Sequence, residues 1–149
     1  MNLLIFLYFY KEMRIINIMV KTIKQTVIID ANPKEVYNTL MDSKKHSQFT
    51  GDKAIISKKV GGSFSVFSGY ITGKNKELAP AKRIVQEWTT TELPKGYYTE
   101  VTYLLKEVGE KTKIEFTQTN VPDDNYKSLS EGWEEYYWTP LKKMLEHQK

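Results

Sequence analysis

The fold of this chain is decided near its C-terminus by Gly132-Trp133-Glu134-Glu135-Tyr136-Tyr137-Trp138-Thr139-Pro140-Leu141-Lys142-Lys143-Met144-Leu145. Four aromatic rings fall within six residues, and a proline and an aliphatic end follow. At 3.6 residues per turn, one face of a helix collects the apolar side chains of Leu129, Trp133, Tyr137, Pro140, Leu141 and Met144, with Tyr136 and Leu145 at its flanks. A helix with so much aromatic area on one face must lie against a large apolar surface.

The first part of the chain predicts one strand and two short helices. Residues 22–30 alternate and are rich in β-branched side chains, which is typical of a strand. Asn32 is a suitable N-cap and Pro33 fits the first helical position, so a helix is expected to begin there and to end near Asp42. Residues 43–49 predict a second short helix.

From Ala54 to Asn120 the hydrophobic period changes to two, and turn residues punctuate the chain. This pattern predicts four or five antiparallel strands, with a tight turn at Ser68-Gly69. The order strand, two helices, strands and long helix predicts an α+β fold in which a curved antiparallel sheet holds the C-terminal helix.

The long helix has two further signals of its own. The pattern Ser128-Leu129-Ser130-Glu131 matches a capping box and predicts the helix start there, although the break at Val121-Pro122 also allows an earlier start. Pro140 leaves the carbonyl of Tyr136 without its usual donor, which predicts a kink, or a water or side chain that fills the gap.

Composition excludes several classes of site. With 149 residues the chain fits one domain, and it contains no cysteine and only two histidines, His46 and His147. Disulfides, thiol catalysis, and thiolate or histidine-rich metal centres are therefore excluded, and we expect no cofactor and no metal. A reducing compartment is compatible, and we expect a cytoplasmic protein. The net charge is +4 with scattered lysines, so no nucleic-acid partner is expected.

The N-terminus carries an apolar run from Leu3 to Tyr10. A membrane span needs about 20 apolar residues, so this run is too short. We expect residues 1–18 to form an extension outside the fold and residues 19–149 to form a single domain. A tail that associates with a membrane is the alternative.

Catalytic constellations are not apparent. The serines near Gly62 have no histidine close in sequence, and adjacent carboxylates such as Glu134-Glu135 point in different directions on a helix. His46 is expected to be exposed or half-buried. We therefore predict that the protein is not an enzyme.

The aromatic residues give two alternatives for the interior. If alternation holds, seven of them line the space between sheet and helix: Phe64, Tyr70, Trp88, Tyr103, Phe116, Trp133 and Tyr137. They form either a solid core or the lining of a ligand cavity. The polar atoms of several tyrosines and tryptophans favour a partly wet interior. Trp138 lies about 100° around the helix from Tyr137, so we expect it to be an exposed contact or to pack at the sheet edge.

In order along the chain, several short motifs resemble the C-terminal domain of the activator of heat shock protein 90 ATPase, a branch of the START-like helix-grip superfamily. The motifs are Asn32-Pro33-Lys34-Glu35-Val36-Tyr37, Phe49-Thr50-Gly51, Val60-Gly61-Gly62-Ser63-Phe64, Ser68-Gly69, Thr72-Gly73, Leu78-Ala79-Pro80, Ile84-Val85-Gln86-Glu87-Trp88, Leu93-Pro94-Lys95-Gly96-Tyr97, Val121-Pro122, Gly132-Trp133, Tyr136-Tyr137 and Leu141-Lys142. The similarity covers residues 21–145, and the ordered spacing of the motifs is its specific part.

The resemblance implies a sheet that wraps the long helix and leaves a groove or cavity. It also implies a co-chaperone-like role, in which the domain binds the heat shock protein 90 dimer and assists its ATPase cycle. Full-length eukaryotic activators carry a separate N-terminal domain that supplies much of this contact, and we expect the 149 residues to hold no counterpart of it. The alternative function is binding of a small hydrophobic ligand, lipid-like or aromatic, in the helix-grip cavity.

Overall fold

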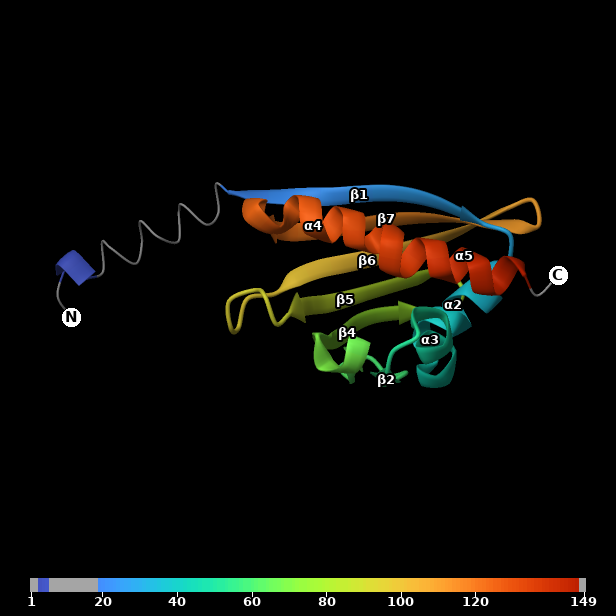
Figure 1. Ribbon diagram of the computed structural model, residues 1–149, viewed down its shortest axis with the longest axis horizontal. Helices are drawn as coiled ribbons and strands as arrows, with labels where there is room; N and C mark the ends of the chain where they lie inside the picture. Colours follow the sequence, from blue (N-terminus) through green and yellow to red (C-terminus); the bar gives the residue numbers. More distant parts are fainter. Residues whose placement is uncertain (1–2, 6–18, 148–149) are drawn as a thin grey trace.

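The computed structural model describes residues 3–5 and 19–147. Its elements are shown in Figure 1. In chain order they are β1 (Val20–Ile29), α2 (Pro33–Met41), α3 (Ser43–Thr50), β2 (Ile55–Ile56), β3 (Ser63–Val66), the 3-10 turn η1 (Phe67–Gly69), β4 (Ile71–Ala79), β5 (Arg83–Thr90), β6 (Thr99–Val108), β7 (Lys111–Pro122), α4 (Asp123–Trp133), the π-helical turn η2 (Glu134–Trp138) and α5 (Thr139–Glu146). The predicted α+β helix-grip order is confirmed.

All seven strands belong to one antiparallel sheet with the order β1-β7-β6-β5-β4-β3-β2. The first strand therefore pairs with the last, with Ile23 opposite Gln118. Six strands follow the two short helices, rather than four or five, because the very short β2 pairs with β3, which in turn pairs with β4. Register shifts in β1 and β4 accompany the curvature of the sheet.

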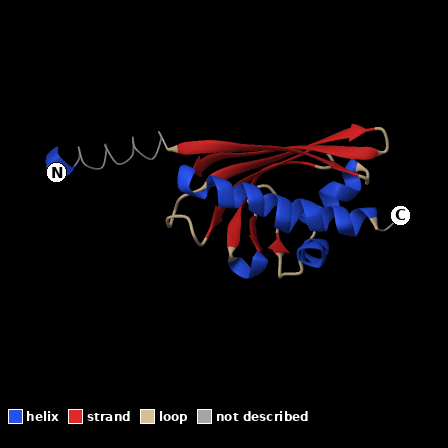
Figure 2. Cartoon of the chain, turned by 45° about the horizontal axis from the view of Figure 1, so that its top comes forward, coloured by secondary structure: helices blue, strands red, loops and turns tan. Residues whose placement is uncertain are grey.

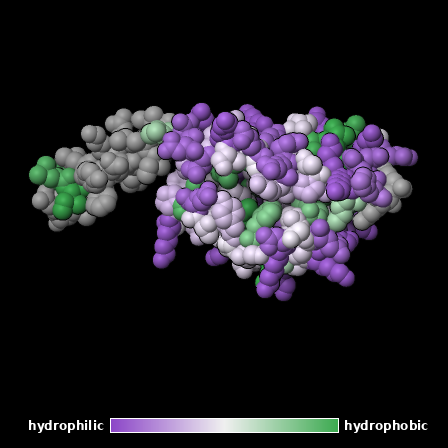
Figure 3. Space-filling view, viewed as in Figure 1, coloured by the Kyte–Doolittle hydropathy of each residue, from purple (hydrophilic) through white to green (hydrophobic). Residues whose placement is uncertain are grey.

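The helices α4, η2 and α5 continue one another and lie across one face of the sheet, as Figures 1 and 2 show. The shorter α2 and α3 lie at the end of the sheet where α5 finishes. Asn32 caps α2 by accepting a hydrogen bond from the backbone N–H of Glu35, and Pro33 occupies the first turn, as predicted. Hydrophilic side chains cover most of the face seen in Figure 3, and hydrophobic residues show only in small areas between them.

The long helix begins at Asp123, five residues before the predicted capping box. Ser128 lies inside α4, so the capping-box prediction is wrong. Asp123 and Asp124 place negative charge in the first turn, where it interacts favourably with the helix dipole. The N–H of Asp123 also donates to the carbonyl of Met19 at 2.7 Å, and its carboxylate pairs with Lys21 at 2.8 Å. The break at Val121-Pro122 is therefore the true start signal.

The predicted irregularity at Pro140 takes the form of the wider turn that precedes it. The N–H of Thr139 donates to the carbonyl of Glu134, five residues back, rather than four. Trp138 and Thr139 keep right-handed helical dihedral angles on either side of the junction. The helix thus accommodates the proline by inserting one extra residue into a turn, which also changes which side chains face the sheet.

Residues 6–18 lie outside the described residues, so the predicted extension over 1–18 stays a prediction. Leu3, Leu4 and Ile5 are described and exposed. Within the two described ranges, no helix combines the length and the apolar composition that crossing a bilayer requires.

Candidate functional site

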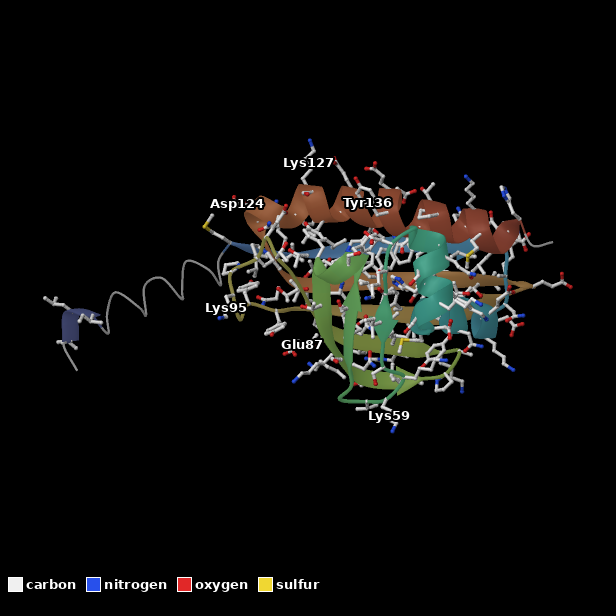
Figure 4. All side chains as sticks on the ribbon, turned by 60° about the horizontal axis from the view of Figure 1, so that its bottom comes forward. Lys59, Glu87, Lys95, Asp124, Lys127 and Tyr136 are labelled. Carbon is white, nitrogen blue, oxygen red and sulfur yellow. The ribbon has the colours of Figure 1, made fainter. Side chains whose placement is uncertain are left out.

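A groove of about 420 Å³ opens between the turn η1 and the long helix. We call it the aromatic groove, because six of its lining residues carry aromatic rings. Its lining consists of Asp52, Phe67, Tyr70, Ile71, Trp88, Glu92, Ser128, Leu129, Gly132, Trp133, Tyr136 and Tyr137. Figure 4 shows Tyr136 on the long helix above η1. The volume lies within the range of small-molecule sites, roughly 300–1,000 Å³.

Buried rings from the helix and the sheet form the floor of the aromatic groove. Trp88 on β5 and Trp133 on α4 are almost fully buried, and their ring centroids lie 5.6 Å apart. The indole N–H of Trp133 donates to Oε1 of Gln118 at 2.8 Å, and the amide of Gln118 donates to the hydroxyl of Thr99 at 2.9 Å. This buried chain of hydrogen bonds fixes the orientation of the Trp133 ring.

Tyr137, the third floor residue, is tied to α3. Its hydroxyl lies 2.8 Å from Nε2 of His46. His46 is only 2% exposed, so the prediction that it lies at the surface is wrong. Burial lowers the pKa of His46 to about 4, which keeps the ring neutral at pH 7. Burial also raises the pKa of the Tyr137 hydroxyl. Both partners are therefore neutral in the folded protein at pH 7.

The rim opposite the helix is a strained turn. Phe67, Ser68 and Gly69 have φ angles of 52°, 54° and 90°, and only glycine adopts such angles without cost. The N–H of Ser68 donates to the carbonyl of Lys53 at 3.0 Å, which holds the turn in place. The Phe67 ring lies 5.7 Å from the Tyr137 ring, so the turn reaches the aromatic floor of the groove. The tight turn predicted at Ser68-Gly69 is confirmed.

Comparisons with known proteins are consistent with this architecture. The family described as "Activator of Hsp90 ATPase homolog 1-like protein" matches residues 30–146. The chain belongs to this family. It is 32% identical to an activator of 90 kDa heat shock protein ATPase homolog from Dictyostelium discoideum, over 76% of this chain and 30% of that protein. It is 25% identical to the human activator homolog 1, over 81% of this chain and 35% of that protein.

Among solved structures, an HSP90 activator from Plasmodium falciparum superposes with a TM-score of 0.78 at 26% identity. The match covers 83% of this chain and 95% of that one. The chain spans about a third of the length of the curated family members it matches. The predicted resemblance and the helix-grip fold are both confirmed.

In this family member the predicted lining residues divide into three groups. Trp88, Trp133 and Tyr137 form the floor of the aromatic groove, and Tyr70 lies at its mouth. Phe64 and Tyr103 line, with Tyr137, an interior cavity of only about 10 Å³. Phe116 is 1% exposed and packs 4.4 Å from the Trp133 ring. The space between sheet and helix is therefore mostly filled, and the open volume lies at one end.

The polar atoms of Trp133, Tyr137 and Trp138 bond to protein side chains. Whether these residues hold a ligand stays a prediction.

The predicted inward orientation of Tyr70 is wrong, and of the two alternatives for Trp138 only one holds. Tyr70 is 38% exposed, because the turn η1 interrupts the strand and Ile71 takes the inward position. Trp138 is 1% exposed and is not a surface contact. Its indole N–H donates to Oε1 of Gln25 on the edge strand β1 at 2.7 Å, as the sheet-edge alternative required. The wider turn η2 brings Trp138 round toward the sheet together with Tyr137.

Sequence reasoning did not identify four residues that shape the site: His46, Asp52, Phe67 and Glu92. Only the position of His46 carried a usable signal, because His46 and Phe49 are three residues apart on α3 and are its two buried side chains. The other three lie in or beside loops, whose approach to the helix depends on the curvature of the sheet.

Proposed function

We propose that this protein is a co-chaperone-like domain that binds heat shock protein 90 and modulates its ATPase cycle. Membership of the activator family over residues 30–146 is the observation that supports this proposal most strongly. The similarity to an HSP90 activator along nearly the whole of that structure adds to it. Because the matched region covers only 30% and 35% of those curated proteins, the proposal concerns binding first and stimulation second.

The test measures the ATPase rate of the heat shock protein 90 from the same organism with increasing amounts of this protein. We expect saturable binding and a change in rate that a specific inhibitor of the chaperone abolishes. A chain that begins at Met19 serves as the comparison for the N-terminal residues, and we expect it to act like the full chain. Absence of both binding and any rate change would remove the proposal.

A regulatory rather than enzymatic role agrees with the chemistry of the core. The buried His46 bonds to a neutral phenol and has a depressed pKa, so it is not arranged as a general base for a nucleophile. In the described ranges, no three histidine, cysteine or acidic side chains lie close enough together to hold a metal ion. The chaperone role also implies a cytoplasmic location, which stays part of the proposal.

A second candidate function is the binding of a small hydrophobic ligand in the aromatic groove. The observation that favours it is the groove itself, about 420 Å³ with a fixed aromatic floor. Gly132 lies on the helix wall, and a Cβ atom built there meets only Cδ2 of Tyr136, at 3.9 Å. The groove therefore stays open partly because this position has no side chain.

Gly132→Leu fills the groove and tests this second function. We expect it to abolish binding of aromatic ligands while the protein stays folded, since the new side chain enters open space. Glu135→Leu, on the exposed side of the same helix, is the matched control and should bind as the wild type does. Chemical shifts of the indole N–H groups of Trp88 and Trp133 report occupancy. If these shifts do not move with any ligand, the second function is excluded.

A further inference from the structure

The charge of the aromatic groove is opposite to that of the whole protein. The chain carries 22 lysines and arginines against 18 acidic residues. Of the twelve described residues that line the groove, two are acidic, Asp52 and Glu92, and none is basic. Both carboxylates are exposed at the mouth, whereas the floor is aromatic and buried. A ligand that fits this arrangement has an apolar body and a positive end.

The two carboxylates flank the strained turn η1. On one side the backbone N–H of Ser68 donates to the backbone carbonyl of Lys53, the residue that follows Asp52. On the other side the Thr91 N–H donates to the carbonyl of Tyr70 at 3.0 Å, which places Glu92 next to the end of the turn. The acidic groups therefore approach one mouth of the groove from two separate loops.

Asp52 is held in place as an anion. The hydroxyl of Ser68 donates to Oδ1 of Asp52 in a short hydrogen bond, and the backbone N–H of Lys53 donates to the same oxygen at 2.8 Å. These two bonds hold the pKa of Asp52 below its usual range. The carboxylate therefore stays charged and oriented without a basic partner inside the groove.

Aromatic rings beside a carboxylate are suited to an organic cation. The face of an aromatic ring is negative and attracts ammonium groups, most strongly where water is excluded. Tyr70 and Tyr136 carry exposed rings on the same groove as the two acidic groups. We propose that the aromatic groove binds small organic cations, such as a protonated or quaternary amine carried by an aromatic or aliphatic body. This proposal rests on the second candidate function above.

The test compares three ligands with the same apolar body and different charge: 4-phenylbutylamine, 4-phenylbutanol and 4-phenylbutyrate. Binding is followed at pH 7 by tryptophan fluorescence and calorimetry. We expect the amine to bind about tenfold more tightly than the alcohol, and the carboxylate to bind most weakly. The advantage of the amine should shrink as salt rises from about 20 to 500 mM, because the acidic groups are exposed.

Two variants locate the recognition. Asp52→Asn keeps the acceptor for Ser68, and Glu92→Gln keeps the shape of the side chain. Each should weaken amine binding about threefold to fivefold and leave alcohol binding unchanged, whereas Glu135→Gln, outside the groove, should change neither. Thermal melts confirm that each variant is folded. If all three ligands bind equally well and Gly132→Leu blocks them, cation recognition is wrong but the ligand function stands. If none binds, both are wrong.

Discussion

The buried pair of His46 and Tyr137 makes stability depend on pH in a definite direction. In the folded protein the pKa of His46 lies near 4, against an ordinary value of 6.5, because burial disfavours the charged imidazolium. The unfolded chain therefore binds more protons than the folded chain between these two values. The contribution of His46 to the free energy of unfolding is therefore fully favourable above about pH 6.5. It decreases as the pH falls toward 4.

The size of the effect follows from the difference between the two pKa values. At about 1.36 kcal/mol per pKa unit, a drop from 6.5 to about 4 corresponds to about 3 kcal/mol of unfolding free energy. About 2 kcal/mol of it should already be lost between pH 7.5 and 5.0. This window lies above the ordinary pKa values of Asp42, Asp52 and Glu115, which are 3.8, 3.8 and 4.5, and their contribution to stability is lost only as the pH falls below those values.

Urea denaturation at several pH values measures this loss directly. His46→Gln can still bond to the Tyr137 hydroxyl but does not titrate, so its stability should be nearly constant from pH 7.5 to 5.0. His147→Gln, in the exposed C-terminal turn, should keep the pH dependence of the wild type. The reasoning fails if the wild type loses less than about 0.5 kcal/mol in this window, or if His46→Gln shows the same slope.

Three further substitutions test local features by denaturation at pH 7. Gly132→Ala should stabilise the protein by about 0.5–1 kcal/mol, because a helical glycine is replaced where the new Cβ meets only Tyr136 at 3.9 Å; a loss of stability would contradict the open wall. Trp138→Phe should lower the free energy of unfolding by about 2 kcal/mol, because it leaves the side-chain oxygen Oε1 of Gln25 without the indole donor at 2.7 Å. An unchanged denaturation midpoint would contradict this bond. Gly73→Ala should cost about 2 kcal/mol or more, because its Cβ would lie 1.9 Å from a backbone oxygen of the next strand; a tolerated alanine would contradict that close approach.

The fold could be predicted because its signals are local. A β-branched alternation, an Asn-Pro helix start and a glycine turn each specify one element through backbone and capping chemistry. Where two signals competed, the local reasoning failed. Ser128 and Glu131 match a capping box, yet Pro122 and the acidic pair after it begin the helix, because the chain must turn there to return along β1. A capping pattern inside a helix is simply a run of polar side chains.

The site was only partly predictable, because it depends on geometry that no local pattern records. An ideal helical wheel separates Tyr137 and Trp138 by about 100° and places Trp138 off the centre of the apolar stripe. The π-helical turn η2 changes that spacing, and both rings are buried. Similarly, the left-handed angles of Phe67 and Ser68 bring a phenyl ring into the groove, and Tyr70, which alternation places inward, lies at its mouth. Sequence reasoning found the aromatic floor and missed the acidic rim.

The floor and the rim of the aromatic groove contribute differently to the stability of the fold. This difference limits which residues can change ligand preference. Trp133 packs against Phe116 and stacks on Trp138 at 5.6 Å, so replacing it removes core contacts as well as the groove floor. Asp52 and Glu92 are exposed, and replacing them removes little core packing. Ligand preference can therefore change at the rim without loss of the fold, whereas the aromatic floor is constrained by stability. The aromatic helix that packs against the sheet is for this reason also the wall of the groove that tolerates the least change.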